Sequence, residues 1–324
     1  MTKKNYIALS AVLAGGILAG CQQLKLPREQ SAAQPYEESS VKGSDAQPRK
    51  ESSVEDSDAQ PQKESSLQDD LQEPALEILH FVDAFGAPYQ VKINPKVKKH
   101  DYRMEAFVRK GDRLSYKGDS RYRSRLGVDV SYHNGNIDWN RVKAAGIEFV
   151  FLRIGYRGYG QAGNVCLDTM FFQNIQNARA AGLDVGVYFF SQAINEEEAA
   201  EEAAFVLSNL AGYDLQLPVV YDPESILDAE ARTDNVSGRQ FTKNTIVFCE
   251  QVAAAGYQPM IYSNMLWEAY QFKLAKLSEY PIWYADYEKL PQTPYAFEFW
   301  QYSNEGVVDG IDGVVDMDIQ LVEN

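Results

Sequence analysis

Two acids separated by one residue, Asp222 and Glu224, follow a short apolar run at residues 217–221. The run is bracketed by prolines and rich in β-branched and aromatic residues, which is typical of a strand buried on both faces of a parallel sheet. Side chains two apart on an extended backbone point the same way, so we expect both carboxyl groups to enter one pocket. Barrel enzymes keep their acid–base chemistry at this end of a strand. Two solvated acids in a turn are the simpler alternative, and the pair alone would favour it.

Two further acids are expected at the same rim. Asp129 lies near the end of a first strand at 126–131, and Asp316 lies near the end of a last strand at 314–317. The first and last strands of a closed barrel are neighbours, so these acids should converge with the pair. Aromatic residues are expected at the ends of the intervening strands: Tyr188, Tyr262, Trp283 and Tyr302. A cleft with carboxylates at its floor and aromatic walls suits sugar rings, although each aromatic residue alone could equally belong to the core.

The elements that must position these residues alternate between strand and helix from residue 125 onward. Strands are predicted at 126–131, 149–154, 185–190, 217–221 and 260–262, and helices at 138–146, 168–181, 196–210, 240–255 and 265–272. We expect Asp138 and Asp168 to cap the first two helices. Strand-like segments follow at 282–284, 297–302 and 314–317, with gaps too short for crossover helices. The pattern predicts an α/β fold, an irregular TIM-like (β/α)5(β)3 barrel over residues 125–324.

Composition narrows the functional classes. The 324 residues carry a formal net charge of -15. Proteins that bind the phosphates of nucleic acids need a basic patch, so we expect no nucleic-acid partner. The three cysteines, Cys21, Cys166 and Cys249, form no C-x-x-C pair and none lies near a histidine. We therefore expect no metal and no cofactor. A bond between Cys166 and Cys249 is open, and two buried free thiols are the preferred interpretation.

The first 21 residues are typical of an export signal. Lys3 and Lys4 precede an apolar run at 7–18, which is too short to span a bilayer comfortably. The segment ends in Leu-Ala-Gly-Cys at 18–21, which resembles the lipobox of bacterial lipoproteins. Cleavage there would leave Cys21 acylated and anchored to the cell membrane, facing the cell wall. An uncleaved signal anchor is the alternative, but it does not explain the cysteine.

Two segments separate this signal from the barrel. Residues 22–74 are rich in Ser, Glu, Gln, Asp and Pro and contain a 13-residue repeat that begins at 38 and again at 51. Such a composition cannot bury enough apolar surface to order itself, so we predict a disordered tether. Residues 75–124 are predicted to form an accessory β-rich segment, with a hairpin of strands at 78–82 and 89–93. A wall-binding role and a docking role are both open for it.

Seven segments together carry a family resemblance: GVDVSYHNGNIDW at 127–139, GVYFFS at 186–191, PVVYDPE at 218–224, PMIYSN at 259–264, PIWYADY at 281–287, FWQYS at 299–303 and GVVDMD at 313–318. In this order they make the chain from 126 to its end resemble glycoside hydrolase family 25, the lysozymes that cut peptidoglycan. The resemblance places the four active-site acids of the family on Asp129, Asp222, Glu224 and Asp316. The tether and the accessory segment lie outside it.

The resemblance implies a muramidase that cleaves the β-1,4 bond between N-acetylmuramic acid and N-acetylglucosamine. Glycoside cleavage needs a proton donor and support for an oxocarbenium-like centre. We assign the donor role to Glu224, whose pKa should be raised by its acidic neighbours, and an ionised, acetamido-orienting role to Asp222. Asp129 and Asp316 would position the substrate. A nucleophilic Asp222 and an inverting route through water both stay open at this stage.

Parts of the sequence also fit three rival interpretations. Asp309, Asp312, Asp316 and Asp318 superficially resemble a calcium loop, but the twelfth position from Asp309 lacks its Glu. A wall-binding module without catalysis and a barrel glycosidase on other N-acetylated glycans are the others. The expected partners are therefore peptidoglycan strands and the membrane through Cys21, with the protein a monomer. The acidic charge favours a tethered enzyme acting on its own cell's wall, because tethering replaces electrostatic capture.

Overall fold

The computed structural model describes residues 77–226, 228 and 231–324. The predicted export signal, Cys21 and the repeat-containing tether lie outside the described residues. Among the helices that are described, none is both long and apolar enough to cross a bilayer.

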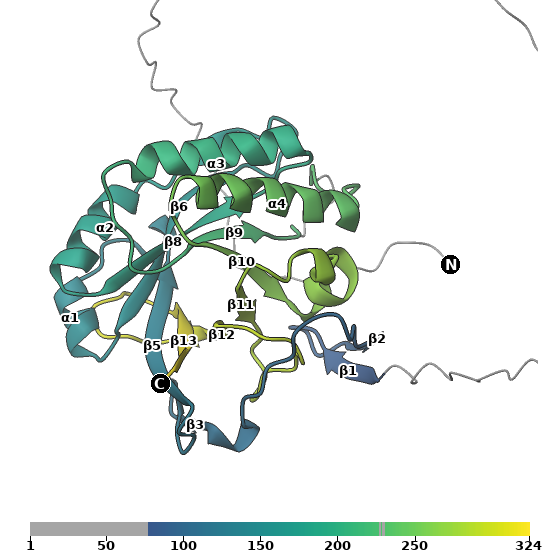
Figure 1. Cartoon of the computed structure of the whole chain (residues 1–324). Coiled ribbons are helices and arrows are strands. Elements are labelled where there is room, and N and C mark those ends of the chain that lie inside the picture. The colour runs from purple at the N-terminus through teal and green to yellow at the C-terminus, as the bar shows by residue number, and fades with distance from the viewer. Residues whose placement is uncertain (1–76, 227, 229–230) are drawn as a thin grey trace, which may run out of the picture. The chain divides into compact units, whose positions relative to one another are not determined.

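An eight-stranded sheet closes on itself around the molecule's centre (Figure 1). Its strands, in spatial order, are β5 (Tyr122–Val130), β6 (Phe149–Arg157), β8 (Asp184–Ser191), β9 (Val219–Pro223), β10 (Pro259–Asn264), β11 (Ile282–Ala285), β12 (Phe299–Gly306) and β13 (Val315–Glu323). The pairing of β5 with both β6 and β13 completes the ring. A short strand, β7 (Val165–Leu167), is added antiparallel to β6. The predicted closed barrel in a mixed α/β fold is confirmed.

Helices cover the outside of the first half of the barrel (Figure 1): α1 (Trp139–Ala144), α2 (Phe171–Ala180), α3 (Glu196–Leu210) and α4 (Gly238–Ala254). Asp138 caps α1 as predicted, because its side chain accepts a hydrogen bond from the Arg141 backbone N–H. The cap predicted at Asp168 is wrong: α2 starts at Phe171, and the buried Asp168 side chain instead pairs with Arg153.

The connection after β10 differs from the predicted fifth helix. It consists of a π-helical turn, η3 (Trp267–Gln271), and a 3-10 turn, η4 (Leu274–Lys276). Two other 3-10 turns lie earlier in the chain: η1 (Met104–Ala106) directly precedes β3, and η2 (Tyr132–Asn134) directly follows β5. The described barrel therefore has four α-helical crossovers rather than five.

The last strand runs opposite to the predicted direction. β13 is antiparallel to both β12 and β5, whereas the seven other barrel strands run parallel to one another. Only a short loop separates β12 from β13, and a parallel crossover needs a dozen or more residues. Asp316 therefore lies at the start of its strand, not near its end. The reversal still brings Asp316 to the rim where the parallel strands end.

Two apolar layers hold the barrel together. One lies between the helices and the outer face of the sheet, and the other fills the barrel interior with residues such as Phe149, Phe151 and Phe299. The interior rings fit because Gly127 on β5 has no side chain. A Cβ there would lie 2.2 Å from the Phe149 ring, closer than real contacts allow.

Residues before the barrel form two small hairpins, β1 (Ile78–Val82) with β2 (Pro88–Lys92) and β3 (Phe107–Lys110) with β4 (Arg113–Tyr116). Both contact barrel residues. The segment between the hairpins also contacts the chain just before β12: the Tyr102 hydroxyl donates to the Phe297 carbonyl at 2.5 Å, and Lys99 pairs with Tyr295 in an isolated antiparallel β-bridge. The predicted boundary at residue 125 falls inside β5.

Candidate active site

Three acids lie side by side where β5 meets β13. Asp129 and Asp316 are directly opposite each other in the antiparallel register. Asp318 follows Asp316 by two residues, so it shares the same face, and both Asp316 and Asp129 are close enough to influence its pKa. Gln301 on β12 donates to Asp129 Oδ2 at 2.7 Å, and the Trp283 indole donates to Asp318 Oδ1 at 2.8 Å.

The pair on β9 faces this group. Asp222 is buried at the end of the strand, and Glu224, two residues later, is half-buried. A hydrogen bond joins the two carboxyl groups, as expected for side chains two apart on extended backbone. The charge of Asp222 contributes to raising the pKa of Asp129, so the pair and the β5–β13 acids lie within electrostatic range. The structure thus brings together Asp129, Asp222, Glu224 and Asp316.

Burial dominates the electrostatics of the cluster. Loss of water raises the pKa of Asp222 to about 8, against the opposing effects of its bond to Glu224 and the positive charge of Arg153. It raises the pKa of Asp316 to about 7. Burial and the neighbouring acids hold the pKa of Asp129 well above its usual range. At neutral pH the cluster therefore retains protons that isolated carboxylic acids would have lost.

One cation, Arg153 on β6, is fixed beside the acids. Its Nε donates to Asp168 Oδ2 at 2.9 Å, and its guanidinium lies 4.9 Å from the Tyr132 ring centroid and 5.2 Å from that of Tyr156. This aromatic sandwich and the buried Asp168 remove the side chain's freedom. Arg153 Nη2 and Asp222 Oδ1 are both buried and have no hydrogen-bond partner among the described residues. Two such atoms at one cleft are suited to a polar ligand.

A buried hydrogen-bond network holds the backbone of Glu224 in place. The Gln192 side chain donates to the Glu224 carbonyl at 2.7 Å. Thr233 donates to Gln192 Oε1 at 3.1 Å, and Arg232 donates to the Gln192 carbonyl at 2.9 Å while it pairs with Glu198. Glu224 is therefore positioned by side chains from the start of α3 and the segment that leads into α4.

Three of the four predicted aromatic residues lie at the barrel mouth. Tyr188 is half-buried, and the charges of Asp129 and Asp222 add to the burial that raises its pKa. Tyr262 and Trp283 are almost fully buried beneath it, and their rings are 5.0 Å apart. The Tyr262 hydroxyl donates to Gln301 Oε1 at 2.9 Å. Tyr262 and Trp283 hydrogen-bond to the polar side chains of the site, namely Gln301 and Asp318. Of the three aromatic residues, Tyr188 is the one that is partly exposed to solvent.

The prediction that Tyr302 lines the cleft is wrong. Its hydroxyl donates to the Asp112 carbonyl at 2.9 Å and accepts from the Leu114 backbone N–H at 3.3 Å. Arg109 lies over its ring. Alternation along β12 explains the error: Gln301 points into the barrel, so its neighbour Tyr302 points out, under the β3–β4 hairpin.

Four functional candidates were not predicted: Asp318, Gln301, Arg153 and Tyr287. Tyr287 follows β11, its hydroxyl donates to Gln301 Oε1 at 2.9 Å, and its pKa is raised by burial and by the charges of Asp316 and Glu224. Asp318 could have been found, because it shares a face with Asp316 in the spacing D-x-D. Arg153 had a weaker indication, a single charge inside the apolar strand FVFLRIG.

Other predictions about ions and thiols can be placed. Among the described residues, no group of three or more potential ligands is arranged to hold a metal ion. Of the predicted calcium-like acids, Asp309 pairs with Arg141, while Asp316 and Asp318 face the barrel interior. Cys249 is a free, fully buried thiol in α4, so it does not pair with Cys166.

Residues 128–311, more than half of the chain, match the family model "Glycosyl hydrolases family 25". The chain belongs to this family. The match covers β5 to β12, and includes Asp129, Asp222 and Glu224. Asp316 and Asp318 lie just beyond its end, so their place in the site comes from the register of β13 with β5.

Relatives of this family 25 protein include an uncharacterized bacterial protein and a lysozyme. YegX of Escherichia coli (strain K12) is 31% identical over 203 residues, which are 60% of this chain and 68% of YegX. Lysozyme M1 of Streptomyces globisporus is 28% identical over 202 residues, 59% of this chain and 65% of that protein. The crystal structure of a bacterial lysozyme from Streptomyces coelicolor aligns with a TM-score of 0.51 and 27% identity, over 60% of this chain and 90% of that one. The protein is a glycoside hydrolase.

Proposed function

We propose that this acid cluster is the active centre of a peptidoglycan muramidase, which cleaves the β-1,4 bond between N-acetylmuramic acid and N-acetylglucosamine. The observation that supports it most is the convergence of Asp129, Asp222, Glu224 and Asp316 on one rim of the barrel, beside a single fixed arginine. Family membership and lysozyme relatives support the same reaction.

In this proposal Glu224 donates a proton to the leaving glycosidic oxygen. It is the less buried member of the β9 pair, so it can reach a substrate, while Gln192 fixes its backbone. As the bond breaks, positive charge develops at the anomeric carbon and ring oxygen. The carboxyl groups of Asp129 and Asp316 face this position and stabilise that charge when they ionise.

Asp222 is proposed to orient and polarise the N-acetyl group, whose oxygen attacks the anomeric carbon. Its buried, unpartnered Oδ1 is a suitable acceptor for the acetamido N–H. A donor at this oxygen favours the ionised form of Asp222, which moves the proton shared by the pair toward Glu224. Substrate binding thereby places the proton on the residue that must donate it.

A nucleophilic Asp222 is the competing route, and its product differs. It would give a covalent glycosyl ester on Asp222, whereas assistance by the N-acetyl group gives an oxazolinium ion with no bond to the protein. Mass spectrometry of the enzyme quenched during turnover distinguishes them. We expect no mass increase on the peptide that contains Asp222.

Digestion of two substrates tests the proposed reaction. Purified peptidoglycan should release new reducing ends that are muramic acid, and soluble chitin oligomers of equal concentration should release none. Cleavage of chitin at a comparable rate would contradict the muramidase assignment and favour a glycosidase of broader N-acetylated substrates. Release of no reducing ends from peptidoglycan would contradict the function itself.

We also propose that the protein is a lipoprotein held on the outer face of the cell membrane by an acylated Cys21, acting as a monomer. The lipobox-like residues 18–21 and the tether composition support this. Replacing Cys21 by Ala should move the protein from the membrane fraction to the soluble extracytoplasmic fraction. A Cys21→Ala protein that stays with the membrane would contradict the anchor.

A further inference from the structure

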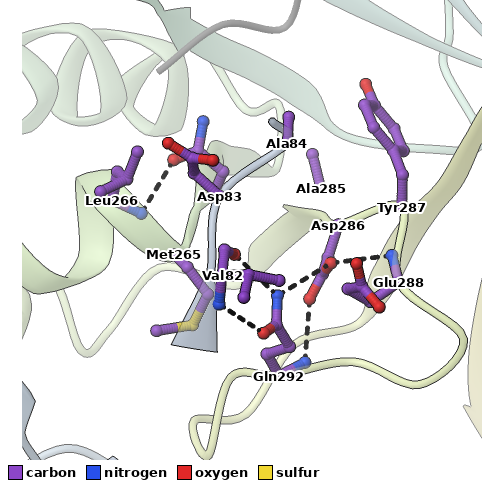
Figure 2. A pocket seen from close by; sticks show the side chains of 11 residues that line it. Val82, Asp83, Ala84, Met265, Leu266, Ala285, Asp286, Tyr287, Glu288 and Gln292 are labelled. Atoms are coloured by element: carbon purple, nitrogen blue, oxygen red, sulfur yellow. Dashed lines mark hydrogen bonds between the residues drawn. The ribbon is translucent and has the colours of Figure 1, made fainter. Parts of the chain in front are cut away.

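A second hollow lies at the barrel rim, between the β1–β2 hairpin and the ends of β10 and β11. Its volume is about 170 Å³, below the ~300–1,000 Å³ typical of small-molecule sites, so it suits only a small group. Figure 2 shows Val82, Asp83 and Ala84 of the hairpin on one side, and Ala285, Asp286 and Tyr287 on the other.

The Gln292 side chain fixes the hairpin wall to the barrel. Gln292 accepts from the Val82 backbone N–H at 2.8 Å and donates to the Val82 carbonyl at 3.0 Å, as a neighbouring strand would (Figure 2). The Gln292 backbone in turn donates to Asp286 at 2.9 Å. On the other side of the turn, Asp83 accepts from the Phe85 and Ala87 backbones. The wall is therefore preorganised rather than a loose loop.

Tyr287 connects the hollow to the active site by a hydrogen bond. This residue lines the hollow, and its hydroxyl donates to Gln301, the residue that also donates to Asp129. Ala285 lines the hollow as well and belongs to the apolar interior around Trp283. A polymer that lies across the acids could thus extend into the hollow without leaving the protein surface.

We propose that this hollow is an additional saccharide subsite, which binds a sugar unit of the glycan strand beyond the two that flank the cleaved bond. This inference rests on the muramidase function proposed above. The lining offers what a pyranose needs: an aromatic residue in Tyr287, apolar contacts, and carboxylate and amide groups for hydroxyls in Glu288 and Asn264. Three of the eleven lining residues, 82–84, lie outside the segment that matches the family model, so the accessory hairpin extends the family's cleft.

A bulky side chain in the hairpin turn tests the proposal. Ala84 is exposed and lines the hollow, so Ala84→Trp should fill it without disturbing the core. We expect KM for long, peptide-free glycan strands to rise ~5–10-fold, with kcat nearly unchanged, because uniform binding is lost. Cleavage of the disaccharide of N-acetylmuramic acid and N-acetylglucosamine, which fills only the two positions that flank the cleaved bond, should keep kcat/KM within about twofold of wild type. Glu288→Ala should show the same selectivity for long strands with a smaller effect.

Phe85→Trp is the matched control, because Phe85 is exposed in the same turn but does not line the hollow. It should behave as wild type on both substrates. An unchanged KM of Ala84→Trp for long strands would overturn the subsite, as would an equal loss on both substrates. Wild-type cleavage of the disaccharide reports the catalytic function separately, so failure of that function would be distinguished from failure of the subsite.

Discussion

Arg153 and Asp222 each keep one buried polar atom without a partner among the described residues. Unsatisfied buried groups are costly, about 1–3 kcal/mol each, and sites of this kind are filled by a ligand or by water. Arg153 also lowers the pKa of Asp222. Its proposed role is therefore positional: its charge favours the ionised form of Asp222, and its Nη2 group can donate to an acceptor oxygen of the substrate.

Arg153→Met should move the acidic limb of the kcat/KM profile to higher pH by about one pH unit. Removal of the positive charge raises the pKa of Asp222 further, so a higher pH is needed to ionise it. In Arg153→Lys the acidic limb should lie close to its wild-type pH, because the lysine keeps the positive charge. The exposed Arg141, which pairs with Asp309, provides the control Arg141→Met, with an unchanged profile. Loss of activity in Arg153→Met with no movement of the limb would contradict this role.

Residue types and spacing were enough to predict the acids but not their surroundings. Asp222 and Glu224 could be found because an acid pair directly after a buried apolar strand is typical of a barrel rim. The importance of Arg153 depends on Asp168 and on two tyrosines from other segments, and that environment exists only in the folded chain.

At the scale of elements, the antiparallel β13 determines the site. Its register sets Asp316 opposite Asp129 and brings Asp318 into the same row. The sequence predicted the strand and the closed barrel but not the direction of the strand. Asp316 was predicted at the correct rim, but at the end of a parallel strand rather than at the start of an antiparallel one. The D-x-D spacing places Asp318 on the same face as Asp316, but only the register with β5 shows that both lie beside Asp129.

The row of buried acids predicts a pH-dependent stability. The folded-state pKa values of Asp316, about 7, and Asp222, about 8, are raised above those of an unfolded chain, near 4. Their stabilising contribution is complete below pH ~4 and is lost as pH rises through 7 to 8. Each acid contributes about 1.4 kcal/mol per pH unit between its unfolded and folded pKa values, so the free energy of unfolding should fall by about 2–3 kcal/mol per pH unit between pH 5 and pH 7. Urea denaturation at pH 5 and pH 8 measures it, and Asp316→Asn should reduce the difference. Stability that rises over the same window would contradict the assigned burial effects.

Tyr302 provides a test of the corrected orientation of β12. Tyr302→Phe removes two hydrogen bonds to the 112–114 segment and should lower the free energy of unfolding by about 1–3 kcal/mol. Its kcat/KM on peptidoglycan should stay close to wild type below the unfolding temperature. Tyr287→Phe, whose hydroxyl bonds Gln301, is the comparison and should lower activity more than stability. A Tyr302→Phe enzyme that is stable but inactive would contradict the outward orientation and indicate that Tyr302 lines the cleft.

On the scale of the whole molecule, composition and motif order predicted the class of protein, and the contacts of the accessory segment were not predictable. Residues 75–124 show strand patterns, but nothing in them indicates which barrel residues they meet. The segment is held by hydrogen bonds that involve backbone atoms, at Gln292, Tyr295 and Phe297. Hydrogen bonds to backbone atoms cannot be predicted from the pattern of side chains. The subsite proposed between hairpin and barrel follows from this docking alone.

The central claim is that Glu224 donates the proton for cleavage of the glycan. Mass spectrometry of muropeptides released from purified peptidoglycan by wild type and by Glu224→Gln tests it most directly. The amide keeps the size and hydrogen bonding of the side chain but cannot donate a proton of suitable acidity, so release should fall at least ~10²–10³-fold, with an unchanged unfolding curve. Undiminished release of muramic-acid-ended products by Glu224→Gln would contradict the proton-donor role.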